Sequence, residues 1–267
     1  MNGHRISGTR LERLAAELTE RDWAIVEMLG RLHLVTGNQL VRVHWPQASP
    51  AEERAARRTL ARLTRWRVLA RLERRMGGLG RGSESWTYAL DVAGQRLRRQ
   101  AGSARRPHLP RAAMWAHALT VSEVYTRLVE ALRQSQAELG EWQGEPQSWR
   151  KYAGPYGEAL VIKPDAYVEV DGPDYADLFF LEIDTGSQSR TVVAGKLAAY
   201  RGYAATGQEQ AAEGVFPKVV FVTTTAERHA VLVDVLGSQP PESWPLFAAG
   251  LVTDTARLLV TGAEAAS

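Results

Sequence analysis

Two short stretches in the second half of the chain decide the fold: LVIKPDAYVEV at residues 160–170 and DLFFLEIDTGS at residues 177–187. Both are rich in β-branched and aromatic residues, which is typical of buried strands. Side chains alternate along a strand, so Glu182 and Asp184 are expected on one face. If the two strands are neighbours, Asp165 joins them. Such a cluster of carboxylates needs a cation, a shared proton or wide exposure to water.

Hard oxygen ligands of this kind suit Mg²⁺ or Mn²⁺. The pattern therefore predicts a divalent metal site with three ligands: Asp165, Glu182 and Asp184.

The chain has 267 residues, enough for two ordinary domains, and no cysteine. The lack of cysteine excludes disulfides, thiolate zinc sites and a cysteine nucleophile, and favours a cytoplasmic protein. No apolar run is long enough for a membrane-spanning helix, so no membrane partner is expected. The N-terminal sequence also has no apolar signal core.

Charge is divided unevenly along the chain, although the net charge is only +3. Residues 54–106 hold 15 arginines against three acids, whereas residues 138–213 hold 13 acids against six bases. This asymmetry predicts a module that binds a polyanion, joined to a module of another kind.

The first half of the sequence predicts three helices followed by a hairpin, after a loose amphipathic lead-in over residues 1–19. The helices are expected from Thr19, from about residue 38 to Trp45, and over 50–66 with Ser49 as N-cap. Two strands, at 68–74 and 85–90, flank a glycine-rich loop. A short helix then closes the region.

This order resembles a winged helix-turn-helix, in which the third helix enters the major groove of double-stranded DNA. The predicted DNA contacts on the third helix are Arg54, Arg57, Arg58, Arg62 and Arg65, and those at the hairpin are Arg74, Arg75 and Arg81. The hairpin arginines would contact phosphates and so fix position rather than sequence. The alternative for the helix is an exposed, salt-bridged surface, but few acids lie one turn away from these arginines.

The predicted organisation is a winged-helix domain over residues 1–100, a linker over 101–112 and a second domain over 113–267. The second domain should contain a long helix at 113–139, strands at 159–170 and 177–184, and a helix at 190–205. A strand at 218–223, a helix at 226–236 and one or two strands within 246–259 should follow. This is an α/β (α+β) arrangement with a mixed central sheet.

The second domain resembles the PD-(D/E)XK nuclease superfamily, or restriction-endonuclease-like fold, through Pro164-Asp165, Glu182-Ile183-Asp184 and Lys196. The resemblance implies a metal held by Asp165 and Glu182, with a third residue that orients the attacking water. That third residue is usually lysine, whereas here it is Asp184, and Lys196 on the next helix could take its place. Glu123 is a further candidate for an outer ligand.

Together the two halves resemble the replication-relaxation family of plasmid and integrative-element proteins, which is related to mobilisation relaxases. The segments that carry this resemblance are WAHAL at 115–119, KPDAY at 163–167, LEIDTGS at 181–187 and KLAAYRGY at 196–203. The resemblance implies DNA nicking or relaxation at a plasmid origin, with Asp165, Glu182, Asp184 and Lys196 as catalytic candidates. The candidate partners are double-stranded DNA, a second copy of the chain, and replication or transfer proteins.

Two other functions remain open from the sequence. The chain could be a non-catalytic replication or transcription regulator that keeps a degenerate nuclease fold, or an adaptor for other replication proteins. Its six histidines form no His-hydrophobe-His metal motif. Tyr200 or Tyr203 could serve as a covalent nucleophile, but core packing is the simpler interpretation of both.

Overall fold

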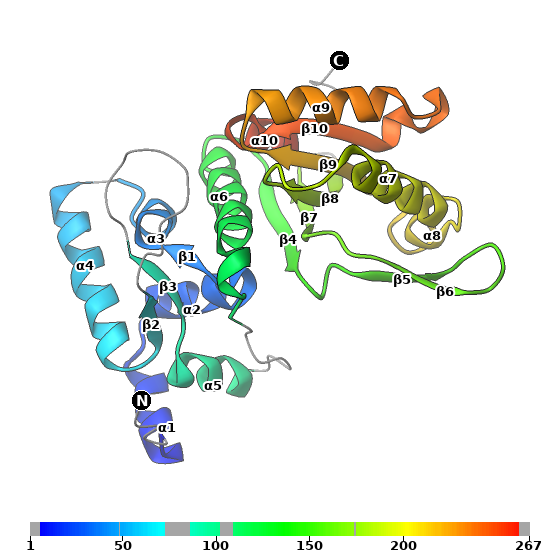
Figure 1. The fold of residues 1–267 in the computed structure, drawn as a ribbon. Helices are drawn as coiled ribbons and strands as arrows, with labels where there is room; N and C mark the ends of the chain where they lie inside the picture. The colour runs from blue at the N-terminus through cyan, green and yellow to red at the C-terminus, as the bar shows by residue number, and fades with distance from the viewer. Residues whose placement is uncertain (1–5, 48, 73–85, 102–108, 174, 262–267) are drawn as a thin grey trace. The chain divides into compact units, whose positions relative to one another are not determined.

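The computed structural model describes residues 6–47, 49–72, 86–101, 109–173 and 175–261 (Figure 1). The chain divides into two compact units, Met1–Ser122 and Glu123–Ser267. The glycine-rich loop, Arg74, Arg75, Arg81 and most of the predicted linker lie outside the described residues.

The first unit is mainly helical. Its helices are α1 (Gly8–Glu17), α2 (Glu20–Leu32), α3 (Gly37–His44), α4 (Pro50–Arg65) and α5 (Val92–Gln100), followed by the 3₁₀ turn η1 (Ala112–Met114). Thr19 caps α2 with a capping box to Asp22, and Ser49 caps α4 with Pro50 in the first turn. The predicted start signals of α2 and α4 are thus confirmed. The amphipathic character expected of the lead-in is confirmed, because Leu11 and Leu14 bury one side of α1, but the expectation of a loose segment is wrong for Gly8–Glu17.

A small antiparallel sheet completes this unit in the order β1-β3-β2, from β1 (Val35–Thr36), β2 (Leu69–Leu72) and β3 (Thr87–Leu90). The pairing of Leu69 with Leu90 and of Leu72 with Thr87 confirms the expected antiparallel strands. The two-residue strand β1, which pairs with β3, was not predicted.

Helix α6 (Trp115–Leu132) contains the division between the units. It ends earlier than the predicted 113–139, since residues 138–144 form a strand instead. Its first half belongs to the first unit, where the buried Ser122 hydroxyl donates to the Leu34 carbonyl at 2.5 Å.

The second unit is built on a five-stranded mixed sheet in the order β10-β9-β8-β7-β4 (Figure 1). Its strands are β4 (Glu138–Gly144), β7 (Ala166–Asp171), β8 (Ala176–Asp184), β9 (Lys218–Thr223) and β10 (Phe247–Leu251). β4, β7 and β8 run antiparallel, and β8, β9 and β10 run parallel. A mixed sheet was predicted, and β8 lies at its centre.

The remaining elements of this unit are the hairpin β5 (Arg150–Ala153) and β6 (Ala159–Ile162), the helices α7 (Arg190–Ala204), α8 (Gln208–Glu213), α9 (Ala226–Gly237) and α10 (Val252–Val260), and the 3₁₀ helix η2 (Pro241–Leu246). The single strand expected over 159–170 is wrong: the chain leaves β6 at Lys163-Pro164-Asp165 before β7 begins. The strands expected in 246–259 are only partly right, because α10 follows β10. β5 and α8 were not predicted.

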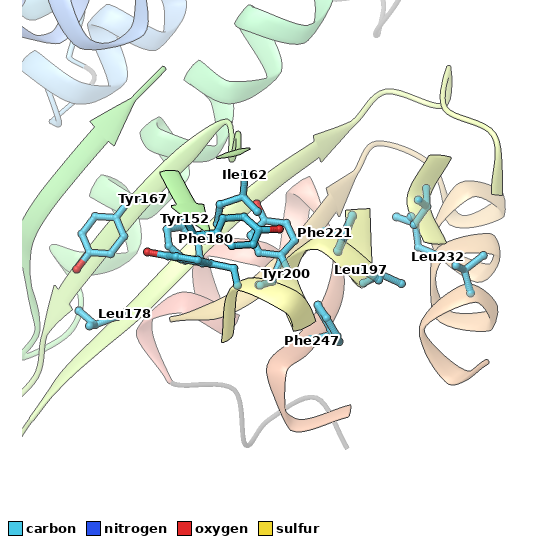
Figure 2. Packing of buried hydrophobic residues seen from close by; sticks show 14 residues of the cluster. Tyr152, Ile162, Tyr167, Leu178, Phe180, Leu197, Tyr200, Phe221, Leu232 and Phe247 are labelled. Carbon is cyan, nitrogen blue, oxygen red and sulfur yellow. The ribbon is translucent and has the colours of Figure 1, made fainter. Parts of the chain in front are cut away.

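The core of the second unit lies between the sheet, α7, α9 and the β5–β6 hairpin. Figure 2 shows this cluster, in which Phe180 and Phe221 come from the sheet, Leu197 and Tyr200 from α7, and Leu232 from α9. Phe180 and Glu182 are two residues apart on β8 and therefore point to the same face. This places the Glu182 carboxylate against α7, at the border of the apolar core.

Candidate functional site

The acidic end of β8 carries the candidate site of the second unit. The Glu182 side chain is buried at 4% exposure, yet both of its oxygens have partners. Lys196 Nζ donates to Oε2 at 2.5 Å and Tyr200 Oη donates to Oε1 at 2.7 Å. Lys196 and Tyr200 are one turn apart on α7, so a single helix face supplies both donors.

The charges of Lys196 and Asp165 act on the buried Glu182 carboxylate. Burial raises the pKa of Glu182 to about 7; the Lys196 ammonium works against this rise and the Asp165 carboxylate adds to it. Burial is the largest single influence on the pKa of Lys196 and would lower it, but the charge and hydrogen bond of Glu182, with the charges of Asp165 and Asp184, together outweigh burial, and the pKa is raised. Lys196 therefore stays protonated at neutral pH.

Tyr200 is a hydrogen-bond donor in this arrangement. Burial raises the pKa of Tyr200 well above its ordinary value, and Glu182 raises it further. Tyr203 similarly donates to Glu209 Oε1 at 2.6 Å. Burial is the main cause that raises the pKa of Tyr203, and the hydrogen bond to Glu209 raises it further. Both tyrosines are buried in the core cluster, which agrees with their interpretation as packing residues.

Asp184, the next residue on the same face of β8, is paired with an arginine that the sequence analysis missed. Arg228 donates to Asp184 Oδ2 from Nε at 3.0 Å and from Nη2 at 2.5 Å, and the Gly186 N–H donates to Oδ1 at 2.7 Å. The Asp184 side chain is 2% exposed and that of Arg228 13%. Arg228 lies in the first turn of α9, which follows β9. Because β9 is parallel to β8 and Thr223 lies beside Asp184, this topology brings the two side chains together.

Asp165 lies beside β8 as predicted, in the segment that precedes β7. Its Oδ2 accepts from the Ile183 N–H at 2.6 Å, and its own N–H donates to the Leu181 carbonyl at 2.9 Å. The carboxylate thus bridges to the backbone of β8 between Glu182 and Asp184. The remaining candidate, Glu123, accepts from Arg127 Nε at 2.8 Å within α6.

These contacts do not fit a metal ion held by all three carboxylates. The oxygens of Glu182 accept hydrogen bonds from Lys196 and Tyr200. Those of Asp184 accept from Arg228 and from the Gly186 N–H, and one oxygen of Asp165 accepts from the backbone of β8. Within the described ranges, no group of three or more His, Asp or Glu side chains is placed to hold a metal. The Mg²⁺ or Mn²⁺ site therefore stays a prediction from the sequence.

Helix α4 carries the candidate site of the first unit. Its apolar side packs inward through Ala56, Leu60 and Leu63. The exposed arginines of this helix are Arg54, Arg57, Arg58 and Arg65. At 100° per residue these four fall within one third of the helix circumference, opposite the apolar stripe.

The fifth predicted DNA contact, Arg62, is engaged inside the unit. Its Nη2 donates to both oxygens of the fully buried Asp22, at 2.7 and 2.6 Å, and its guanidinium stacks over Trp66 at 5.0 Å. Arg62 therefore fixes α4 to α2, a role that the sequence analysis did not anticipate.

Comparison of the sequence with known proteins identifies the family of the chain. Residues 26–219, most of the chain, match the replication-relaxation family. No curated protein and no solved structure gives a significant match. In the part of the chain that the structure describes, none of the helices has the length and apolar character needed to cross a membrane. The chain thus belongs to the replication-relaxation family, and this membership points to a role in plasmid replication.

Proposed function

We propose that the protein is a double-stranded DNA-binding protein that acts in the replication or mobilisation of a plasmid or related mobile element. The observation that carries the proposal is the arginine face of α4, where Arg54, Arg57, Arg58 and Arg65 project opposite the buried stripe. A helix of this kind beside a small antiparallel sheet suits a winged helix-turn-helix, whose recognition helix lies in the major groove. Family membership supplies the biological setting.

Binding of duplex DNA from the region that flanks the gene tests this proposal. Arg58→Ala should weaken binding, and the slope of log K against log salt should fall by about 0.9 for each phosphate contact removed. The matched control is Arg257→Ala on α10, another exposed helical arginine, which should leave both quantities unchanged. Equal affinity for wild type and a variant lacking all four α4 arginines would overturn the proposal.

The second candidate function is cleavage of a DNA strand at the acidic end of β8. Lys196 together with Asp165, Glu182 and Asp184 favours it, since the charges of all three carboxylates act on Lys196. A half-buried lysine held in its charged form can stabilise negative charge on a phosphate. The internal ion pairs of Glu182 and Asp184 favour the alternative, a regulator that keeps a nuclease-like fold without cleavage.

A nicking assay on supercoiled plasmid that carries the flanking DNA distinguishes DNA cleavage from regulation without cleavage. Incubation with Mg²⁺ or Mn²⁺ should give open circles with wild type and none with Glu182→Gln if this site cleaves. Duplex affinity should stay equal for both proteins. Tight binding without open circles from either protein would leave the regulator as the function. A second copy of the chain and replication or transfer proteins remain predicted partners.

A further inference from the structure

The β5–β6 hairpin has two unlike faces. Its strands pair Lys151 with Val161 and Tyr152 with Leu160. Tyr152 and Ile162 point into the core cluster and are buried (Figure 2). Side chains alternate along each strand, so the residues between them project away from the core.

The outward face combines an indole, a valine and two ammonium groups. It is formed by Trp149, Lys151, Ala153, Ala159, Val161 and Lys163. None of these six residues is acidic. Trp149 is 38% and Val161 40% exposed, and Lys163 Nζ lies 4.6 Å from the centre of the Trp149 ring. At the tip of the hairpin, Tyr156 is 96% exposed.

Local bonds hold the Trp149 end of this face in place. Trp149 Nε1 donates to Glu145 Oε1 at 3.1 Å, and the buried Ser148 hydroxyl donates to the Pro164 carbonyl at 2.6 Å. Glu145, Glu158 and Asp165 are the nearest acids in sequence. Glu145 is bound to the indole edge, Glu158 to the Tyr156 N–H at the tip and Asp165 to the Ile183 N–H, so none of the three belongs to the six-residue face.

We propose that this face, from Trp149 to Lys163 with Tyr156 at its tip, binds single-stranded DNA. Unpaired bases can stack on Trp149 and Tyr156, whereas in a duplex the base faces are covered by neighbouring pairs. Lys151 and Lys163 provide positive charge for the phosphates of the same strand. The proposal rests on the proposed function, because it assumes that the DNA bound through α4 is opened or nicked.

The face is also continuous with the candidate acidic site. Lys163 is followed by Pro164 and Asp165, and Asp165 is bonded to the backbone of β8. The Lys163 end of the face is therefore followed directly in the chain by the segment that contacts the end of β8.

The test uses the full-length chain and a fluorescein-labelled 12-nucleotide oligothymidylate, with fluorescence anisotropy as the readout. Trp149→Ala should weaken binding at least about fivefold, the lower end of the loss for one stacked base. Trp149→Phe keeps an aromatic face but loses the bond to Glu145, and should stay within about twofold of wild type if stacking dominates. Trp244→Ala, which removes a 50% exposed tryptophan from η2, should have no effect.

The lysines give an independent measurement. Lys151→Ala and Lys163→Ala should each lower the salt slope of oligothymidylate binding by about 0.7, the value for one phosphate contact on a single strand. Thermal unfolding of each variant shows whether it keeps the wild-type fold.

Two results would overturn the proposal: oligothymidylate affinity equal in wild type and in folded Trp149→Ala, or an equal loss with Trp244→Ala. Failure of this proposal can be told apart from failure of the proposed function, because duplex binding is expected to depend on the α4 arginines and not on the hairpin. The hairpin variants should bind duplex DNA as wild type does, and Arg58→Ala should keep the Trp149-dependent part of oligothymidylate binding.

Discussion

The Asp22 carboxylate is fully buried, and its charge is compensated by Arg62, which reaches it from α4. We expect Arg62→Ala to lower the free energy of unfolding by about 3 kcal/mol, because an unpaired buried charge remains. Urea unfolding measures this loss. Arg58→Ala, on the exposed face of the same helix, should change stability by less than about 0.5 kcal/mol.

The double variant Asp22→Asn with Arg62→Ala serves as the control for this prediction. Asparagine can still accept the Thr19 N–H, and no charge is left unpaired, so the double variant should be more stable than Arg62→Ala alone. If the two are equally unstable, lost packing rather than lost charge compensation explains the effect of Arg62.

The Asp184–Arg228 pair allows a comparison with an exposed pair in the same unit. Arg228→Met should destabilise the protein by about 3–5 kcal/mol, since Asp184 is buried. Arg190→Met breaks the pair with Asp234, where both side chains are more than half exposed, and should have almost no effect. Thermal unfolding of both variants compares them directly, and equal melting temperatures would contradict the role assigned to Arg228.

At the level of elements, β4 and β7 place two like charges opposite each other. Glu141 pairs in register with Glu169. Burial raises the pKa of Glu169, and the neighbouring carboxylates of Asp171, Glu141 and Glu213 raise it further. A raised folded-state pKa means that the folded protein binds the proton more tightly, so stability is lost as pH rises through the pKa of the unfolded chain toward that of the folded protein.

Glu141→Gln removes the carboxylate opposite Glu169. We expect the variant to be more stable than wild type at pH 7, by less than about 1 kcal/mol because the strand pair is partly exposed. The advantage should disappear at low pH, where Glu169 is protonated in both states. Chemical unfolding at pH 7 and at acidic pH checks the sign, and an advantage only at acidic pH would contradict it.

How far the elements could be predicted depends on whether their signals are local. The capping residues Thr19 and Ser49 predict helix starts, and the apolar run of residues 177–183 predicts the central strand. β4 has no such signal: it exposes Glu138 and Glu141, and pairing with β7 stabilises it as an edge strand. The residues of α10 were expected to form a strand, although Val252, Ala256 and Leu259 have helical spacing.

The candidate site shows the same limit. Asp165, Glu182, Asp184 and Lys196 could be found because local motifs mark them. Arg228 could not, since only the parallel packing of β9 on β8 brings it to Asp184. Arg62 likewise binds a carboxylate that another helix supplies. Its place in the sequence among exposed arginines could not reveal this contact and suggested a DNA contact instead.

At the scale of the whole molecule, the division into two units falls inside α6 rather than in the linker before it. Gln39 Nε2 donates to the Leu119 carbonyl, and Ser122 donates to Leu34, so the first half of α6 completes the N-terminal unit. A fragment of residues 1–132 should therefore melt at a higher temperature than one of residues 1–111. The two lost hydrogen bonds alone account for about 2 kcal/mol. Circular dichroism melts compare the fragments, and equal melting temperatures would place the boundary before α6.

The Asp184–Arg228 pair also has a consequence for synthesis on the ribosome. The two residues are 44 positions apart, so β8 leaves the exit tunnel well before α9 does. Lys196, only 14 positions after Glu182, emerges much earlier than Arg228. The nascent chain must therefore keep the end of β8 hydrated until α9 arrives, because a carboxylate without its counter-ion resists burial. Closure of the acidic site should accordingly be a late event in the maturation of the newly made chain.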